Sequence, residues 1–383
     1  MRIVQIVGAR PQFVKLGPVA RELARRKAAG ADLEEVVVHT GQHYDPAMSA
    51  AFFDELALPP PAVNLGIGSA THGAQTGRML IALEDFLLGS RPDVVVVYGD
   101  TNSTLAGALA AAKLGLAVAH VEAGLRSFRR TMPEELNRVA TDHLSERLLA
   151  PTAAAMDNLR HEGLAGRARL VGDVMFDAVA TQATRAGRDS RLLAKLGLAA
   201  GTYGVVTLHR AENTAPGALE RALAAIGGVS AGLLPLVFPL HPRTRAAIEA
   251  TLPGWRPPAA LTIIEPVGAL DMLALTASAA VVLTDSGGLQ KEAFILGRPC
   301  VTLRGETEWV ETVAAGANVV VGTDPEAVLL AARRWRDTGW GAGLDLPARA
   351  AQCYGGGLAA SRIVDELQAL AAQRSVPDLA TTQ

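Results

Sequence analysis

The stretch DVVVVYGDTNSTLAGALAAAKLGLAVAHVEAG, residues 93–124, contains the pattern that decides the fold. Two apolar runs, Asp93–Tyr98 and Ala117–Val121, flank an alanine-rich helical pattern that ends at Gly115. Continuous apolar blocks of this kind are typical of strands that are buried on both faces of a parallel sheet. A glycine just before the next apolar run is a common helix stop. The stretch therefore predicts a strand, a helix and a second strand.

The same alternation continues along the chain in both directions. Amphipathic stretches such as Lys15–Arg26, Gln75–Leu88 and Pro216–Ser230 separate the apolar runs. Regular alternation of strands and helices predicts an α/β fold with parallel sheets. The further predicted strands are Ile3–Val7, Glu35–His39, Leu148–Ala150, Arg169–Val171, Gly204–Leu208, Leu234–Pro239, Leu261–Ile264, Ala279–Thr284, Pro299–Leu303 and Asn318–Val321.

Two series of about six strands predict two doubly wound, Rossmann-like domains, which also suits a chain of 383 residues. We expect the first domain at residues 1–172 and the second at 173–357. A last helical pattern, 358–373, is expected to pack back on the first domain. Two such domains would hold a ligand in a cleft between the carboxyl ends of their strands.

Composition excludes several classes of protein. With 36 Lys and Arg against 38 Asp and Glu, the net charge is −2, so no overall positive field exists to attract nucleic acid. The two cysteines, Cys300 and Cys353, cannot form a disulfide framework or a multi-cysteine metal site, and Cys300 is expected in the core. The N-terminus does not resemble a signal peptide, and no apolar run approaches the ~18 residues of a spanning helix. A cytoplasmic protein without a membrane or nucleic-acid partner is expected.

The segment TDSGGLQKEAFILG, residues 284–297, predicts a phosphate-binding helix start. Gly287–Gly288 would let the backbone approach a ligand closely, and the first amides of the new helix would point at it, with Ser286 beside them. Glu292 then falls near the same helical face, where its carboxylate could take two ribose hydroxyls. The alternative is that Asp285 or Ser286 only caps the helix.

The first strand is followed by basic residues. In VGARPQFVK, Gly8 permits a turn, and Arg10 and Lys15 stand before and within the first helical turns. Their charges could neutralise a diphosphate. They could equally be solvated surface residues.

Three carboxylates stand at the ends of strands or at a helix start. Asp100 and Glu122 each follow a buried strand, and Glu134 lies in a first helical turn. Arg138 lies one turn beyond Glu134 on the same face and could hold its carboxylate. Asp100 could instead cap the helix that begins at Thr101, and Glu134 could merely favour the helix dipole.

Two histidines, His209 and His241, directly follow strands of the second domain, which favours a functional role. A metal site would need both histidines and a carboxylate, but no HExxH or similar spacing supports one. The first strand is not followed by GxGxxG, which argues against a nicotinamide cofactor. No cofactor and no metal are therefore expected.

The assembled blocks resemble the non-hydrolysing UDP-N-acetylglucosamine 2-epimerase family over essentially the whole chain. The matching blocks are GARPQFVK, TGQH, YGDT, HVEAGLR, PEELNR, LHRAEN, PLHP, TDSGG and QKEA. The resemblance implies a GT-B fold, a UDP-sugar substrate and a homodimer. It also implies interconversion of UDP-GlcNAc and UDP-ManNAc by anti elimination of UDP to 2-acetamidoglucal, followed by re-addition.

The resemblance also implies roles for single residues. Asp100, Glu122 and Glu134 would be the acid and base carboxylates, and His209 would assist near the leaving diphosphate. The residues implied to bind substrate are Arg10, Lys15, Arg138, His241, Val267, Met272, Ser286, Gly287, Gly288 and Glu292.

Some residues depart from the family pattern. Trp309 replaces an arginine that contacts substrate in some members. The loop before Glu134 carries Arg126, Arg129 and Arg130, which could accommodate the sugar carboxylate of UDP-2,3-diacetamido-glucuronic acid or could be solvent-exposed charges.

The TGQH block continues as Tyr44, Asp45 and Pro46, unlike family members in which this region helps to bind a second, activating UDP-sugar, and this difference predicts weak or absent activation of that kind. A GT-B glycosyltransferase, a hydrolysing epimerase and a silent nucleotide-sugar binding protein are the alternatives. A glycosyltransferase would not need three carboxylates in the first domain.

Overall fold

A computed structural model describes residues 1–42 and 58–375 and divides the chain into two compact units. The N-terminal unit comprises Met1–Ala178 together with the chain from Tyr354 onward, and the C-terminal unit comprises Val179–Cys353. The division lies within helix α7 (Val174–Asp189), so one helix contributes to both units.

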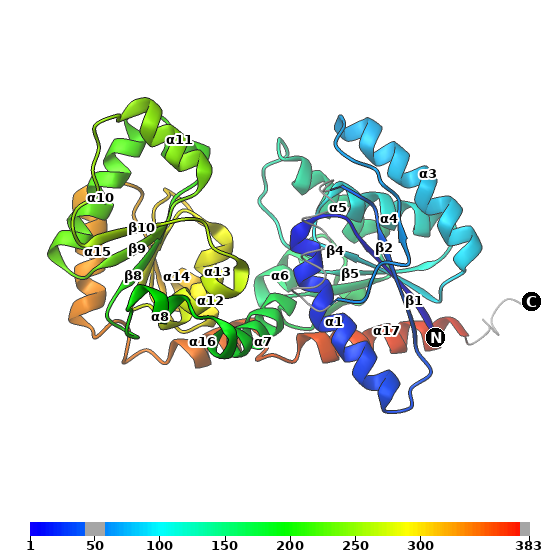
Figure 1. The fold of residues 1–383 in the computed structure, drawn as a ribbon. Coiled ribbons are helices and arrows are strands. Elements are labelled where there is room, and N and C mark those ends of the chain that lie inside the picture. Colours follow the sequence, from blue (N-terminus) through cyan, green and yellow to red (C-terminus); the bar gives the residue numbers. More distant parts are fainter. Residues whose placement is uncertain (43–57, 376–383) are drawn as a thin grey trace, which may run out of the picture. The chain divides into compact units, whose positions relative to one another are not determined.

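The N-terminal unit is built on a seven-stranded parallel sheet with the order β3-β2-β1-β4-β5-β6-β7 (Figure 1). The six strands predicted here are confirmed. The prediction missed β3, because two residues are too few to show a pattern. The strands are β1 Arg2–Val7, β2 Glu34–His39, β3 Val63–Asn64, β4 Val94–Tyr98, β5 Ala117–Val121, β6 Arg147–Ala150 and β7 Ala168–Leu170.

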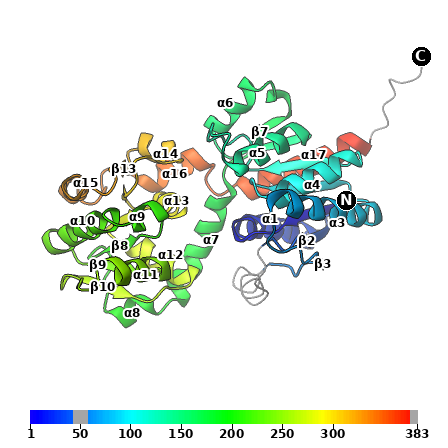
Figure 2. The same cartoon turned by 90° about the horizontal axis from the view of Figure 1, so that it is seen from above.

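Helices cover both faces of this sheet. One apolar core gathers residues of α1 and α17, among them Phe13 and Ile363, against Tyr98 of β4. A second core, on the other face, includes Met79 of α3 and Ala108 of α4. As predicted, the C-terminal helix α17 packs on the first unit, alongside α1 and over β4, β5 and β6 (Figures 1 and 2). The helices are α1 Arg10–Ala28, α3 His72–Ser90, α4 Asn102–Lys113, α5 Pro133–Leu144, α6 Ala153–His161 and α17 Ala359–Ser375.

The C-terminal unit repeats the plan with six parallel strands in the order β10-β9-β8-β11-β12-β13. All six strands predicted for it are confirmed. They are β8 Gly204–Thr207, β9 Leu236–Pro239, β10 Leu261–Ile264, β11 Val281–Thr284, β12 Cys300–Thr302 and β13 Asn318–Val320.

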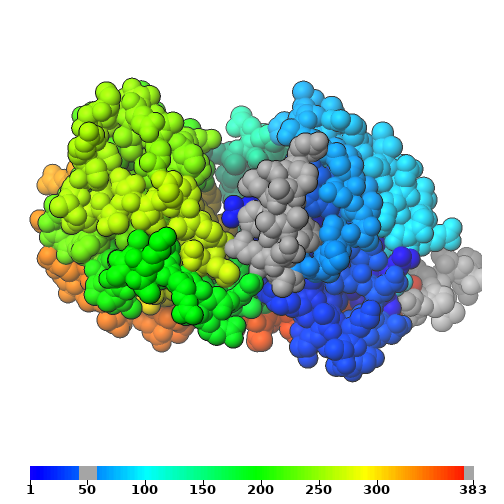
Figure 3. Space-filling model, in the orientation of Figure 1, coloured from blue at the N-terminus to red at the C-terminus, as the bar shows by residue number. Residues whose placement is uncertain are grey.

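The helices of this unit pack on both faces of its sheet. Helix α8 lies against α12, and the two are visible side by side on the surface in Figure 3, in green and yellow-green. Cys300 is 1% exposed in a core with Leu289 and Ala293, and burial raises the pKa of its thiol to about 12. It is a core residue, as predicted. The helices are α8 Leu192–Leu196, α9 Ala211–Thr214, α10 Ala218–Gly232, α11 Pro242–Thr251, α12 Ala269–Ser278, α13 Gly287–Ile295, α14 Val310–Ala314, α15 Pro325–Asp337 and α16 Leu346–Tyr354.

Both sheets reverse their strand order at one point, between β1 and β4 in the first and between β8 and β11 in the second. In open α/β sheets of this kind, ligands bind outside the carboxyl ends of the strands at the point of reversal. The loops that follow these four strands are therefore the first places to look for a site.

Candidate active site

Asp100 follows β4 and is held by helix α5. Its carboxylate forms an ion pair with Arg138, and its backbone carbonyl accepts a hydrogen bond from Asn137 Nδ2 at 3.0 Å. The helix that follows is capped by Thr101, whose hydroxyl accepts from the amide of Thr104. The capping alternative for Asp100 is therefore wrong, and its side chain, 34% exposed, is available to a ligand.

Glu122 follows β5 with φ at +71°, in the left-handed region that non-glycine residues rarely adopt. Its carboxylate forms an ion pair with Lys15 of α1, and the two side chains are only 11% and 12% exposed. A strained backbone that the surrounding structure holds in place is typical of functional sites. Glu122 is thus a buried, charge-paired carboxylate beside the point of strand reversal.

Lys15 lies among these carboxylates. Burial alone would lower the pKa of Lys15, but the charges of Glu122 and then Asp100 outweigh burial and raise that pKa. Gly99 completes the group with φ at +63°, where an added Cβ would lie 3.2 Å from Lys15 Nζ and 3.3 Å from Glu122 Oε2. The structure thus brings Lys15, Asp100 and Glu122 together.

The predicted pairing of Arg138 with Glu134 is wrong. Within the described ranges, Arg138 pairs with Asp100 and, at 3.1 Å, with Glu135. Glu134 is exposed in the first turn of α5. The i, i+4 spacing predicted the shared face, but Asp100 and an acceptor one position along bind the guanidinium.

Glu135 is that acceptor, and the prediction missed it. It is 4% exposed and accepts hydrogen bonds from the amide and hydroxyl of Ser127 and from the amide of Phe128, each at 2.9 Å. Burial alone would raise the pKa of Glu135, but these bonds and Arg138 lower it. Glu135 fixes the arginine-bearing loop onto α5.

Arg126 was predicted either to bind a sugar carboxylate or to be a solvent-exposed charge, and neither prediction is correct. Its side chain is 1% exposed and lies 2.7 Å from both Asp142 and Glu162, so it is neither a solvated charge nor available to a sugar carboxylate. Arg129 and Arg130 are exposed.

At the β1–α1 turn, Gln12 organises the backbone. Its Oε1 accepts from the amides of Gly8 and Ala9 at 2.8 and 3.0 Å, and its Nε2 donates to the carbonyl of Tyr98 at 2.9 Å. Arg10 is exposed at the first position of α1. Gln12 had no role in the prediction, although it lies inside the GARPQFVK block.

Gly8 is required for a reason other than the predicted turn. A Cβ at this position would overlap Thr40 Oγ1 and Ser103 Oγ, and the glycine does not have a positive φ. Close packing excludes a side chain here.

In the C-terminal unit, Asp285 and His209 form the centre of a second group. Asp285 is fully buried, and its Oδ2 accepts from the amides of His209 and Arg210, both at 2.9 Å. Its Oδ1 lies 3.2 Å from His209 Nδ1. Burial alone would raise the pKa of Asp285, but the hydrogen bonds from His209 and Arg210 lower it. Asp285 therefore orients His209, a role that the prediction did not give it.

His241 caps α11, with Nδ1 accepting from the amide of Arg243 at 3.2 Å. Its ring centroid lies 5.6 Å from that of His209. Burial, with the neighbouring charges of His209 and Arg243, lowers the pKa of His241. The ring is neutral near pH 7 and leaves Nε2–H as a donor beside His209.

Helix α13 begins at Gly287, and its cap is Ser286, whose hydroxyl accepts from the amide of Leu289 at 3.4 Å. The indole Nε1 of Trp309 lies 3.4 Å from where a Gly287 Cβ would stand, and Lys291 Nζ lies 4.2 Å from the Trp309 ring centroid. The Trp309 side chain therefore lies directly at the start of α13.

The remaining predicted nucleotide contacts belong to the same region. Gly288 is exposed next to Gly287 in the first turn of α13, and Glu292 is half-buried further along the helix. Met272 packs against both the core under α13 and the core around Tyr203, and Val267 packs against the latter. Helices α12 and α13 are in contact.

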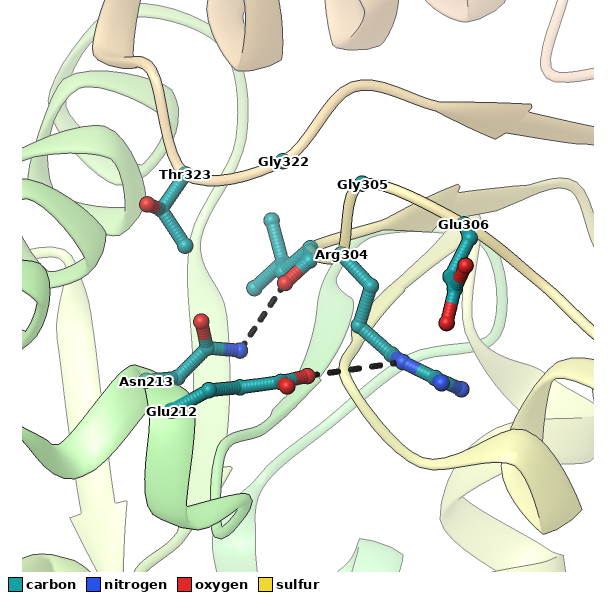
Figure 4. A pocket seen from close by; sticks show the side chains of 8 residues that line it. Glu212, Asn213, Arg304, Gly305, Glu306, Gly322 and Thr323 are labelled. Carbon is teal, nitrogen blue, oxygen red and sulfur yellow. Dashed lines mark hydrogen bonds and ion pairs between the residues drawn. The ribbon is translucent and has the colours of Figure 1, made fainter. Parts of the chain in front are cut away.

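A cavity of about 460 Å³ opens at the carboxyl ends of β12 and β13 (Figure 4). Arg304 and Glu212 reach toward each other in it, 3.6 Å apart, and Asn213 donates to the carbonyl of Leu303 at 2.9 Å. Asn213 also contacts Asp285 at 3.2 Å, so the cavity adjoins the group that holds His209.

Three further observations bear on the predictions. Tyr44, Asp45 and Pro46 lie outside the described residues. Within residues 1–42 and 58–375, no cluster of His, Cys, Asp and Glu could hold a metal ion. No helix in these same ranges has the length and apolar character needed to cross a membrane.

Comparison with known proteins places the chain. A family model described as UDP-N-acetylglucosamine 2-epimerase matches residues 25–368. A Pseudomonas aeruginosa UDP-2,3-diacetamido-2,3-dideoxy-D-glucuronate 2-epimerase is 46% identical, over 97% of this chain and 100% of that protein. A Methanococcus maripaludis UDP-N-acetylglucosamine 2-epimerase homolog is 49% identical, over 86% and 91% respectively.

Solved structures agree. That of UDP-GlcNAc 2-epimerase from Methanocaldococcus jannaschii has a TM-score of 0.83 and 41% identity, covering 96% of this chain and 100% of that one. A second structure of the same enzyme, in complex with UDP-GlcNAc and UDP, has a TM-score of 0.78 with the same coverage. The fold is thus the predicted one, two Rossmann-like domains of the GT-B type.

Proposed function

Because this chain belongs to the UDP-N-acetylglucosamine 2-epimerase family, we propose that it inverts carbon 2 of a UDP-linked 2-acetamido sugar without net hydrolysis. The first candidate substrate is UDP-GlcNAc, interconverted with UDP-ManNAc. The observation that carries the proposal is the group of Asp100, Glu122 and Lys15, two carboxylates at neighbouring strand ends with a cation between them.

The chemistry requires such a group. The C2 proton of a sugar is hardly acidic, so the C1–O bond must largely break before a base can take it. The electron pair of that bond leaves with UDP, a carboxylate accepts the C2 proton, and C1 and C2 become doubly bonded in 2-acetamidoglucal. A proton then returns to C2 on the opposite face, and the UDP oxygen attacks C1 again.

The ion pairs of Asp100 and Glu122 support these two carboxylates as the groups that carry this proton. Each is paired with a cation, Arg138 and Lys15 respectively, which holds the carboxylate in place beyond the end of its strand. Glu134, exposed near Arg138 on α5, is the third proposed carboxylate.

The leaving diphosphate needs stabilisation of its negative charge. The first amides of α13, from Ser286 to Gly288, are suited to this task, as is the positively charged Arg10. Glu292 would take ribose hydroxyls, and Val267 and Met272 would contact the nucleotide. His209, oriented by Asp285 and next to the neutral His241, would donate near the leaving oxygen.

A second candidate substrate is UDP-2,3-diacetamido-glucuronic acid. The Pseudomonas relative that bears this activity in its name matches the chain from end to end. Arg130 is exposed on the loop before α5 and could meet the carboxylate of such a sugar.

The proposal is tested by incubating the protein with each UDP-sugar in deuterated water and following carbon 2 by NMR. Deuterium at C2 of both epimers, with no free sugar, supports a non-hydrolysing epimerase. Free N-acetylmannosamine with UDP would show a hydrolysing epimerase. The absence of exchange at C2, with transfer of the sugar from UDP to an added acceptor, would show a glycosyltransferase.

A further inference from the structure

His120, in the middle of the sheet of the N-terminal unit, is a fully buried histidine to which the proposed reaction gives no role. Its Nε2 lies 2.7 Å from the backbone carbonyl oxygen of Gly99, and its Nδ1 lies 2.7 Å from Asp142 Oδ1. Gly99 is the residue directly before Asp100. The ring therefore bridges helix α5 and the backbone that carries a proposed catalytic carboxylate.

The hydrogen-bond partners define the protonation of this ring. A carbonyl oxygen can only accept, so Nε2 must carry a proton. Asp142 is also an acceptor, because its other oxygen takes hydrogen bonds from the amide of Gly124 at 3.1 Å and from Arg126, 2.7 Å away. Burial alone would raise the pKa of Asp142, but His120 and Arg126 lower it. Asp142 thus holds the ring through Nδ1 and leaves Nε2–H directed at the Gly99 carbonyl.

We propose that His120 is a positioning residue, which places Asp100 by donating from Nε2 to the Gly99 carbonyl while Asp142 holds the ring in this orientation. The positioning role rests on the proposed function, whereas the two hydrogen bonds of the ring do not.

The charged groups next to the ring hold Asp142 in place. Asp142 of α5 faces the ring directly, Arg126 lies on the far side of Asp142, and Glu162 lies 2.7 Å beyond Arg126 and 3.8 Å from His143. Because Asp142 and Arg126 form a buried ion pair, the acceptor of Nδ1 is fixed on the side of the ring opposite Gly99.

The bridge completes a clamp around Asp100. Asn137 holds the Asp100 carbonyl, Arg138 holds its carboxylate, and Asp142 holds the preceding carbonyl through His120. All three clamp residues lie on α5, and Glu134, Arg138 and Asp142 are four residues apart on one face of it. His120 thereby helps to fix Asp100 relative to Glu134.

The hydrogen bonds of the ring are tested on the full-length protein labelled with ¹⁵N-histidine. An Nε2 that carries a proton protected from exchange with solvent is the expected result. An Nε2 without a proton would overturn the proposal.

The positioning role is tested by kinetics. We expect His120→Asn, whose amide reaches only toward Asp142, to lower kcat about a hundredfold, as a small misplacement of a reacting group does. His120→Gln, whose amide nitrogen can take the place of Nε2 and donate to Gly99, should keep more of kcat. The affinity for UDP, measured calorimetrically, should be unchanged in both, and exposed His161→Asn is the matched control.

Wild-type kcat in a folded His120→Asn protein, or an equal loss in the Gln and Asn variants, would overturn the positioning role. If His120→Asn does not fold, the kcat of Asp142→Asn decides, since this variant alters the partner of Nδ1 and keeps the ring: a lower kcat supports the positioning role, and wild-type kcat would overturn it. Failure of the wild type to exchange deuterium into any UDP-sugar would contradict the proposed function, and the ¹⁵N measurement would still test the hydrogen bond from His120 to Gly99.

Discussion

The buried carboxylate of Asp285 contacts His209 at two points. It accepts a hydrogen bond from the His209 backbone amide at 2.9 Å, and it lies 3.2 Å from the His209 ring nitrogen Nδ1. The two residues end neighbouring strands, β8 and β11, at the point where the strand order reverses. One side chain thus fixes both the position and the orientation of the histidine proposed to assist the leaving group.

Asp285→Asn is expected to destabilise the C-terminal unit and to change how its stability depends on pH. The loss of charge weakens hydrogen bonds to the amides of His209 and Arg210, a cost of about 1–3 kcal/mol for buried groups of this kind. The folded pKa of Asp285 is depressed, so its contribution to stability is complete above its unfolded pKa of about 3.9 and is lost as pH falls through the folded value. Denaturant unfolding of both proteins between neutral and acid pH measures this.

The difference between the two unfolding curves should be largest above about pH 4 and should shrink below it. A difference that grows as the pH falls would contradict the assignment of a depressed pKa to Asp285.

Arg138→Ala is expected to lower kcat about a hundredfold while leaving the affinity for UDP unchanged, because it releases the Asp100 carboxylate from its held position. Steady-state kinetics and calorimetry separate the two quantities. Exposed Arg333→Ala is the control. Equal losses in UDP affinity and kcat would show that Arg138 binds the nucleotide and does not act by positioning Asp100.

Glu134 and Glu135 are adjacent carboxylates with different expected roles. Glu134→Gln should lower kcat about a hundredfold or more without changing the free energy of unfolding, because the exposed side chain is proposed to act on the substrate. Glu135→Gln should instead lower stability by about 1–3 kcal/mol, because its buried carboxylate accepts three hydrogen bonds from Ser127 and Phe128. The reverse assignment of effects would show that Glu135 is the chemical group.

Gly8→Ala is expected to cost about 1–3 kcal/mol of stability, because the added methyl overlaps the hydroxyls of Thr40 and Ser103. Gly77→Ala, in α3 with nothing within 4 Å of the added carbon, should stabilise by about 0.5–1 kcal/mol through helix propensity. Thermal unfolding of the two variants makes the comparison. A neutral Gly8→Ala would show that the β1–α1 turn has room to shift.

The sequence predicted the fold well because its strands are continuous apolar blocks, and a parallel sheet buried on both faces leaves that pattern plainly. Strand β3 was not predicted because it has only two residues and one of them, Asn64, is exposed. The carboxylates Asp100 and Glu122 could be found because each follows such a block.

The partners of these residues could not be read in the same way. Helical spacing placed Arg138 on the face of Glu134, but spacing does not show that Glu135 turns inward to accept from the loop. Arg126 stands among exposed arginines in the sequence, and only the fold brings it to Asp142 and Glu162. The sequence suggested a helix cap for Asp285, because the hydrogen bond that Asp285 accepts from His209 joins residues 76 positions apart and leaves no local pattern.

Incorporation of deuterium at carbon 2 tests the central claim most directly. The protein is incubated in deuterated water with UDP-GlcNAc and, separately, with UDP-2,3-diacetamido-glucuronic acid, and both epimers are analysed by NMR. The account predicts that one of these sugars gains a single deuterium at C2 in both epimers while remaining attached to UDP. Substrate that is bound but keeps its C2 proton, with no acceptor present, would contradict it.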